Sequence, residues 1–328
     1  MLICLAAYNA PNEKTFLDKA SCINSRTSSF LINETDSRDL IISGLKDTVA
    51  GFYLGEIIRS HTLNIFNVAN AIVDYMIKES PNIRSVNPVV GETNDSGLND
   101  IQGRHVKKNH VLKAIQNAKS GPVAEGSVGA GTGTRALGFK GGIGTSSRLL
   151  PKEVGGFIVG VLVQTNFGGS LMINGAPVGR ELKKSPFSSN IPYDGEEGSC
   201  MIVIATDAPL SNRNLKRMAK RVNHAFGRVG AYSSNGSGDY AIIFSTHRTQ
   251  ALDDKIISSK ELKNSAMNGL FIATVEATEE AIINSLFMAE TISSKYGRSE
   301  SLPIDETMKI LEKYKALNWN KKLYPWKK

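Results

Sequence analysis

Six apolar residues in an unbroken row, Cys200 to Ala205, constrain the fold of this chain more than any other stretch. A run of this length without a polar interruption is typical of a β-strand that is buried on both faces. Ser199 precedes the run, and Gly198 precedes Ser199 at the end of an acidic turn over residues 194–198. We therefore expect Ser199 at the open end of a buried strand, where its hydroxyl can be held rigidly against a cleft.

The other periodic segments predict sheets covered by helices. Strands and helices occur in runs, without the regular alternation of a parallel doubly wound sheet, so a layered sandwich fits better than a Rossmann fold. Apolar residues at helical spacing predict helices over 65–78, 105–118 and 278–293, and a helix capped by Ser211 that buries Leu215, Met218, Val222 and Phe226. Apolar runs predict strands over 155–164 and 270–275, and a strand–turn–strand over 232–246.

Size and composition bound the possible functions. The chain has 328 residues, which is enough for one large α/β domain or two small ones. Its net charge of +8 comes from dispersed residues, and the most basic cluster, near the carboxyl terminus, lacks a nucleic-acid-binding motif. No stretch approaches the ~18 apolar residues that span a membrane. Three widely spaced cysteines favour a reducing, cytoplasmic location, and the five histidines show no metal-ligand spacing, so we expect no metal and no cofactor.

A glycine-dense segment, residues 126–134 followed by 141–145, allows the backbone to approach a ligand or another strand closely. It is not a Walker loop, because no Gly-Lys-Ser/Thr ends it, and its glycine spacing does not match the dinucleotide fingerprint. A nucleotide site is therefore not the preferred interpretation.

The residues around Ser199 suggest a specific chemistry. If the bond between Gly198 and Ser199 were cut, Ser199 would carry a hydroxyl nucleophile and a free α-amine, and such a residue supplies nucleophile and base by itself. The preceding segment, residues 180–198, is polar and resembles an exposed loop, where chains are commonly cut.

An ordered set of motifs resembles the DmpA-type family of L-aminopeptidase/D-esterases and β-peptidyl aminopeptidases. The resemblance extends over roughly residues 30 to 316, and it is densest between residues 88 and 246. The matching segments are 92–93, 97–101, 103–106, 121–133, 139–148, 161–166, 198–210, 235–239 and 276–282.

The resemblance implies an α/β fold, a four-layer α-β-β-α sandwich of the kind shared with ornithine acetyltransferases. It implies a single domain over 1–328 that cleaves itself between Gly198 and Ser199, leaving an α-chain of 1–198 and a β-chain of 199–328. Residues 1–30 depart from the family's opening strands. The implied function is a serine aminopeptidase that releases small amino-terminal residues from short peptides, amides or esters. Homo-oligomers of processed αβ units are expected, with no nucleic-acid or membrane partner.

Each matched residue carries an implied role. Ser199 would be the nucleophile, and Asn166 matches the oxyanion-hole asparagine, although an asparagine at the end of a strand can also cap a turn. Ser237 and Asp239 match a Ser-x-acid pair, and the same glycine-rich segment would also suit a plain hairpin turn.

Two further matched residues belong to the substrate side of the site. Glu92 matches the carboxylate that pairs with the substrate's amine, and its plain alternative is a surface glutamate. Asn94 stands where the family usually has an aromatic residue, and an aspartate at 239 is shorter than the usual glutamate. These departures keep two alternatives open, an unprocessed homologue without catalysis and an acyltransferase of the ornithine acetyltransferase type.

Overall fold

A four-stranded sheet forms the centre of the molecule. The computed structural model describes residues 65–317, apart from residues 87, 89, 119–120, 187, 189–197, 236, 248–249, 252–256 and 259. Neighbouring strands are antiparallel except for the last pair, which is parallel. The strands lie in the order β3 (Ile143–Leu149), β4 (Ile158–Asn166), β5 (Ser199–Thr206) and β6 (Gly238–Ser245).

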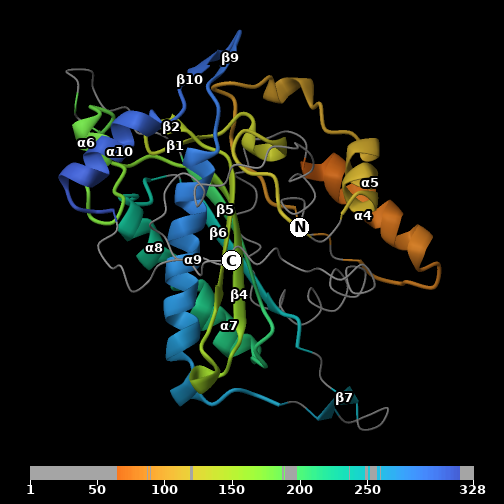
Figure 1. The fold of residues 1–328 in the computed structure, drawn as a ribbon. Helices are drawn as coiled ribbons and strands as arrows, with labels where there is room; N and C mark the ends of the chain where they lie inside the picture. The colour runs from red at the N-terminus through yellow and green to blue at the C-terminus, as the bar shows by residue number, and fades with distance from the viewer. Residues whose placement is uncertain are drawn as a thin grey trace.

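The predicted buried strands at β4 and β5 are confirmed. Every residue of β5 after Ser199 is buried. One face of the sheet packs against helices, and in Figure 1 the long helix α9 (Asn268–Phe287) runs alongside the strands. The other face is also buried, through Met201, Val203, Ala205 and Phe244. A sheet that is buried on both faces requires a layer on each side, as the predicted sandwich does. The expected second sheet lies outside the described residues.

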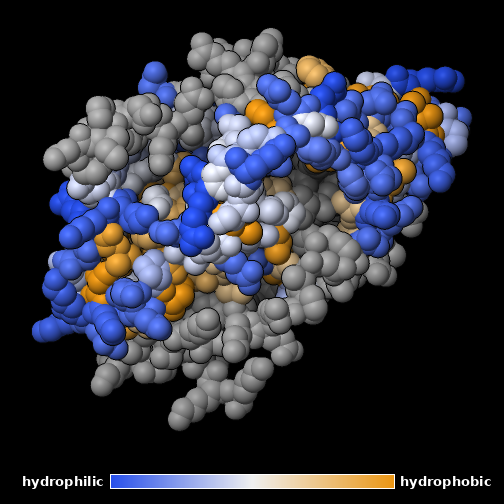
Figure 2. Space-filling view, turned by 90° about the horizontal axis from the view of Figure 1, so that it is seen from above, coloured by the Kyte–Doolittle hydropathy of each residue, from blue (hydrophilic) through white to orange (hydrophobic). Residues whose placement is uncertain are grey.

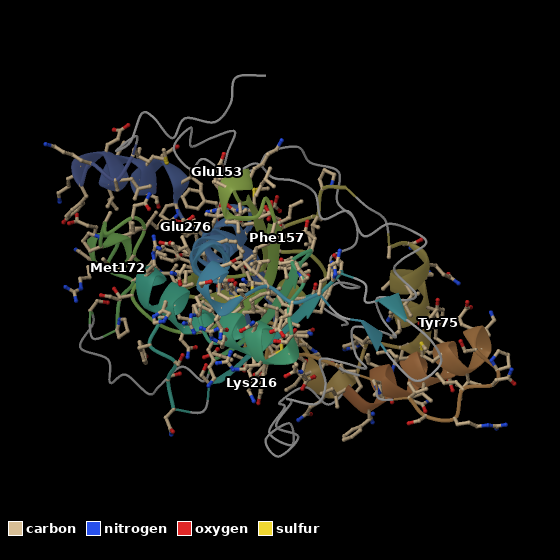
Figure 3. All side chains as sticks on the ribbon, turned by 90° about the horizontal axis from the view of Figure 1, so that it is seen from below. Tyr75, Glu153, Phe157, Met172, Lys216 and Glu276 are labelled. Carbon is tan, nitrogen blue, oxygen red and sulfur yellow. The ribbon has the colours of Figure 1, made fainter. Side chains whose placement is uncertain are left out.

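The helix predicted to begin at Ser211 is two helices. The chain forms α7 (Asn212–Ala219), then turns at residues 220–221 and continues as α8 (Val222–Val229). The Ser211 side chain does not cap α7, because its hydroxyl donates to the carboxylate of Glu261 instead. The predicted buried face is nevertheless correct, and Lys216 points outward from α7 in Figure 3.

Two predicted strands are wrong. Residues 270–275 belong to α9. The prediction failed because this helix is buried around most of its circumference, so its sequence lacks the polar face that distinguishes a helix from an apolar strand. Residues 232–246 contain one strand, β6, rather than a hairpin, because β6 pairs in parallel with β5 and residues 231–235 form no strand.

Smaller elements surround the sheet. The helices α4 (Ile65–Glu79) and α5 (Lys108–Gln116) pack on each other around Val68, Ile72 and Val111, beside the main body (Figure 1), and they confirm the predicted helices there. In the described ranges no helix is long and apolar enough to cross a membrane, and no three His, Cys, Asp or Glu side chains are grouped to hold a metal ion. The other smaller elements around the sheet are β1 (Arg135–Ala136), β2 (Phe139–Lys140), α6 (Val178–Glu181), β7 (Gln250–Ala251), β8 (Ile257–Ser258), β9 (Ile292–Ser294), β10 (Gly297–Ser299) and α10 (Ile304–Lys313), with 3₁₀ turns at Ile101–Gly103, Gly129–Gly131, Lys152–Val154 and Asn264–Ala266.

A polar cluster fastens α9 to the edge strand β3. Arg148 on β3 forms ion pairs with Glu276 and Glu280 on α9, and Figure 3 labels Glu276 on this helix. Glu125 accepts hydrogen bonds from the backbone N and the hydroxyl of Thr145, both at 2.6 Å. Burial, helped by the negative charge of Glu280 and opposed by the hydrogen bonds from Thr145, raises the pKa of Glu125 to about 7.

The raised pKa of Glu125 makes stability depend on pH. The folded protein holds a proton on this carboxyl that the unfolded chain, with a pKa of 4.5, releases. The contribution of this protonated carboxyl to the free energy of unfolding is therefore fully present below pH 4.5, and it is lost as the pH rises toward about 7. We expect Glu125→Gln to remove this decline, which amounts to about 3 kcal/mol, because the glutamine oxygen still accepts both Thr145 donors. Denaturant unfolding at pH 5 and pH 8 measures it, with the exposed Glu290→Gln as control. Parallel pH slopes in wild type and Glu125→Gln would contradict this assignment.

Candidate active site

The pairing register places three residues in one row across the sheet. Asn166 at the end of β4 lies opposite Ser199 at the start of β5, and Ser199 lies opposite Gly238 at the start of β6. Ser237 and Asp239 flank Gly238 in the sequence, so they meet the same end of β5. Four of the predicted residues, which are up to 73 positions apart in the chain, are thus brought together by strand pairing alone.

The carbonyl group of Gly198 is held between two donors. The hydroxyl of Ser199, which is half-buried, donates to Gly198 O at 2.7 Å, and Gly238 N donates to the same oxygen at 2.9 Å. A Cβ atom on Gly198 would lie 3.0 Å from Ser237 Oγ and 3.1 Å from the backbone of Phe167. Only glycine fits here without displacing its neighbours, so the hydroxyl can stay close to the carbonyl that precedes it.

Asn166 has a fixed amide orientation. Its Oδ1 accepts a hydrogen bond from Arg135 N at 3.0 Å, and its Nδ2 donates to the backbone oxygen of Asn94 at 2.8 Å. Because a backbone N–H can only donate, the first bond assigns the oxygen, and hence the nitrogen, of this buried side chain. One of the two Nδ2 hydrogens is used by Asn94. In the described part of the chain no acceptor is bonded to the other.

Ser237 and Asp239 form a hydrogen-bonded pair. The hydroxyl of Ser237 donates to Asp239 Oδ2 at 3.0 Å. Burial raises the pKa of Asp239 above its usual range, while hydrogen bonds from Ser233 and Ser237 lower it. Cys200 lies opposite Asp239 in the sheet, and burial, helped by the charge of Asp239, raises the pKa of its thiol well above normal. Cys200 is therefore a buried, neutral thiol and not a competing nucleophile.

The segment that carries Glu92 is fastened to β4. The hydroxyl of Thr93 accepts a hydrogen bond from Gln164 Nε2 at 2.8 Å, so the backbone next to Glu92 is tied to the strand that ends in Asn166. The side chain of Asn94 turns back on its own segment, where its Oδ1 accepts from Ser96 N at 3.0 Å. Its backbone, not its side chain, contacts the predicted oxyanion residue. The roles assigned to Glu92 and Asn94 stay predictions.

The sequence and the fold together match known proteins. A model of peptidase family S58 matches residues 49–300, more than half of the chain. The chain belongs to peptidase family S58. Among curated proteins it is similar to the β-peptidyl aminopeptidase BapA of Sphingosinicella microcystinivorans, with 41% identity over 282 residues, which is 81% of this chain and 71% of the relative.

Solved structures agree with this assignment. The PH0078 protein from Pyrococcus horikoshii OT3 is 44% identical, with a TM-score of 0.68 over 76% of this chain and 70% of that one. The L-aminopeptidase D-Ala-esterase/amidase from Ochrobactrum anthropi is 33% identical, with a TM-score of 0.69 over 77% of this chain and 72% of that one, and it is described as a variant of the Ntn hydrolase fold. The predicted family, the α/β sandwich and a hydrolase from an aminopeptidase family are confirmed.

A buried lysine near the candidate site, opposite Arg135 in the β1–β2 pair, was not singled out in the sequence. The side chain of Lys140 is fully buried, and its Nζ donates to the backbone oxygens of Gly131 and Gly141, both at 2.6 Å. Burial, helped by the positive charge of Arg135 and opposed by the attraction of Asp95, lowers the pKa of Lys140 to about 7. These two hydrogen bonds link Gly131 and Gly141, which lie in the two parts of the glycine-dense segment. The only sequence signal was a lysine in front of paired glycines.

Proposed function

We propose that this S58 protein is a self-processing serine aminopeptidase with Ser199 as its nucleophile. The proposal rests above all on one observation, the contact of the Ser199 hydroxyl with a Gly198 carbonyl that already accepts a hydrogen bond from Gly238 N. A nucleophile beside a polarised carbonyl is the arrangement that an N-to-O acyl shift requires.

Processing would run in two steps. In the first, Ser199 Oγ attacks the carbonyl carbon of Gly198 and the C–N bond breaks, so that Gly198 becomes an ester of the serine and the nitrogen takes up a proton. The negative charge that develops on Gly198 O meets the N–H of Gly238. In the second step water hydrolyses the ester. The products are a carboxylate on Gly198, which ends the α-chain 1–198, and a free α-amine on Ser199, which begins the β-chain 199–328.

The processed serine then carries out hydrolysis. Its α-amine, with a reference pKa of about 7.7–8.0, is partly unprotonated near neutral pH and can take the proton from its own hydroxyl as Oγ attacks a substrate carbonyl. The remaining Nδ2 hydrogen of Asn166 would donate to the oxyanion. Ser237 and Asp239 form a polar pair beside the nucleophile, and Glu92 is proposed to pair with the substrate's amine.

The relatives support peptides, amides and esters as the substrate class. One is named for β-peptidyl substrates, and another for L-amino acids and D-alanyl esters and amides. Because the matching family and both named relatives are peptidases, hydrolysis is favoured over acyl transfer. We propose small amino-terminal residues, and an oligomer of αβ units, on the resemblance alone.

Purified wild-type protein should consist of two polypeptides, divided between Gly198 and Ser199. Intact-mass spectrometry measures this directly, and amino-terminal sequencing of the smaller piece should begin Ser-Cys-Met-Ile. A panel of β-Ala, L-Ala, D-Ala and Gly p-nitroanilides then tests the aminopeptidase. A single intact chain without activity would instead support the unprocessed homologue.

A further inference from the structure

Arg135 is an exposed residue whose backbone lies next to the candidate site. Its own backbone N donates to Asn166 Oδ1 at 3.0 Å, so the residue begins next to the proposed oxyanion position. Its Nη2 donates to the backbone oxygen of Gly97 at 2.9 Å and to that of Arg298 at 3.5 Å. Within the described part of the chain no carboxylate pairs with it. In Figure 2, the end of the molecule seen from above is predominantly hydrophilic.

Two glycines hold the guanidinium in place. A Cβ atom on Gly97 would lie 3.2 Å from Arg135 Cζ, and one on Gly297 would lie 3.0 Å from Nη2. The planar group therefore lies between the segment around Gly97 and the hairpin of β9 and β10. The two carbonyls account for the hydrogens of Nη2, which leaves the three N–H groups on Nε and Nη1 for another acceptor.

Two neighbouring cations, unlike Arg135, lie near a carboxylate. Arg298 and Lys184 both lie near the carboxylate of Glu300, at 3.7 and 3.4 Å. Lys140 also lies close to Arg135, but Lys140 is attracted by the carboxylate of Asp95. Arg135 is therefore the exposed cation of this group that has no carboxylate paired with it in the described part of the chain. Such a fixed fork with free donors matches the geometry of a carboxylate.

We propose that Arg135 binds the carboxylate of the leaving group, so that the preferred substrates are short peptides with a free carboxyl terminus, dipeptides in particular. The proposal rests on the proposed function, because it takes the scissile carbonyl to lie between Ser199 and Asn166. An extended chain advances about 3.3–3.6 Å per residue, so the carboxylate of a dipeptide follows the scissile carbonyl by a single residue. That brings the carboxylate near the side chain of Arg135, because the backbone N of Arg135 contacts Asn166. Glu92 for the amine and Arg135 for the carboxylate would together select the substrate's length.

Three substrates with the same amino-terminal residue test the proposal: a dipeptide with a free carboxylate, its carboxyl-terminal amide, and the p-nitroanilide. In Arg135→Met, kcat/KM for the free acid should fall roughly 10- to 100-fold, mainly through KM, because a charge-assisted hydrogen bond is lost. The values for the amide and the anilide should stay within about twofold. Arg135→Lys should retain part of the preference for the acid. Arg180→Met, an exposed arginine on α6, serves as the matched control and should not change the preference.

The substrate comparison separates recognition from simple support of the loop. An equal loss on all three substrates would mean that Arg135 only fastens the segment around Gly97, and an unchanged kcat/KM for the acid would also overturn the proposal. If the wild type hydrolyses none of the three, the proposed function is wrong, and the site is then tested by binding alone. Calorimetric titration of the wild type, which in that case leaves the ligands intact, with the dipeptide and its amide should give tighter binding of the acid, and Arg135→Met should lose this difference. Equal affinities, or no binding of either, would reject the carboxylate site.

Discussion

Replacing Ser199 by alanine should give a single unprocessed chain of 35.5 kDa with no aminopeptidase activity. The change removes the hydroxyl that contacts the Gly198 carbonyl, so the acyl shift has no nucleophile. Without the shift, no α-amine is freed, and the proposed base is lost together with the nucleophile. Hydrolysis of the p-nitroanilide panel should therefore fall to the rate without enzyme, while denaturing electrophoresis and intact mass report the missing cleavage.

The control for this variant is an exposed serine without a catalytic neighbour. Ser188 is exposed and donates to the backbone oxygen of Lys183, so Ser188→Ala should process and hydrolyse as the wild type does. Ser199→Cys keeps a nucleophile at the same atom position and should process, at a different rate. Two fragments divided at residues 198 and 199 in Ser199→Ala would show that another group cuts the chain.

The strand that begins at Ser199 was predictable because a single requirement, burial on both faces of the sheet, determines its sequence. Burial on both faces leaves only apolar residues from Cys200 onward, and no helix or loop competes with that pattern. The convergence of Asn166, Ser237 and Asp239 on the same point came from the resemblance. The register that produces it depends on pairing between strands that are far apart in the sequence.

The errors have a different physical origin. Residues 270–275 are rich in apolar and β-branched side chains, and their helical state is imposed by packing against the sheet and α8, which local periodicity does not record. Arg135 and Lys140 were missed for a related reason. Their partners are backbone oxygens of Gly97, Gly131 and Gly141, and a carbonyl has no sequence signature.

Replacing Asn166 by alanine should separate processing from catalysis. The processing oxyanion, on Gly198 O, receives Gly238 N–H and not the Asn166 amide, so Asn166→Ala should still cut itself. The substrate oxyanion would lose its side-chain donor. We expect kcat to fall roughly 10²–10³-fold, about 2.7–4 kcal/mol in the barrier, with KM little changed, because this contact forms only as charge develops.

Two companion variants sharpen the Asn166 test. Asn166→Asp keeps the oxygen that accepts Arg135 N but places a carboxylate oxygen where Nδ2 faced Asn94 O and the oxyanion, so its kcat should fall at least as far as that of the alanine variant. Asn223→Ala, on the exposed face of α8, should match the wild type. Steady-state kinetics on the p-nitroanilides, with intact mass on each preparation, measure both effects. A rise in KM at constant kcat would make Asn166 a ground-state binding residue, and a processing defect would place its amide on the Gly198 carbonyl as well. Either result would remove the division of labour between Gly238 N and Asn166 on which the proposed mechanism depends.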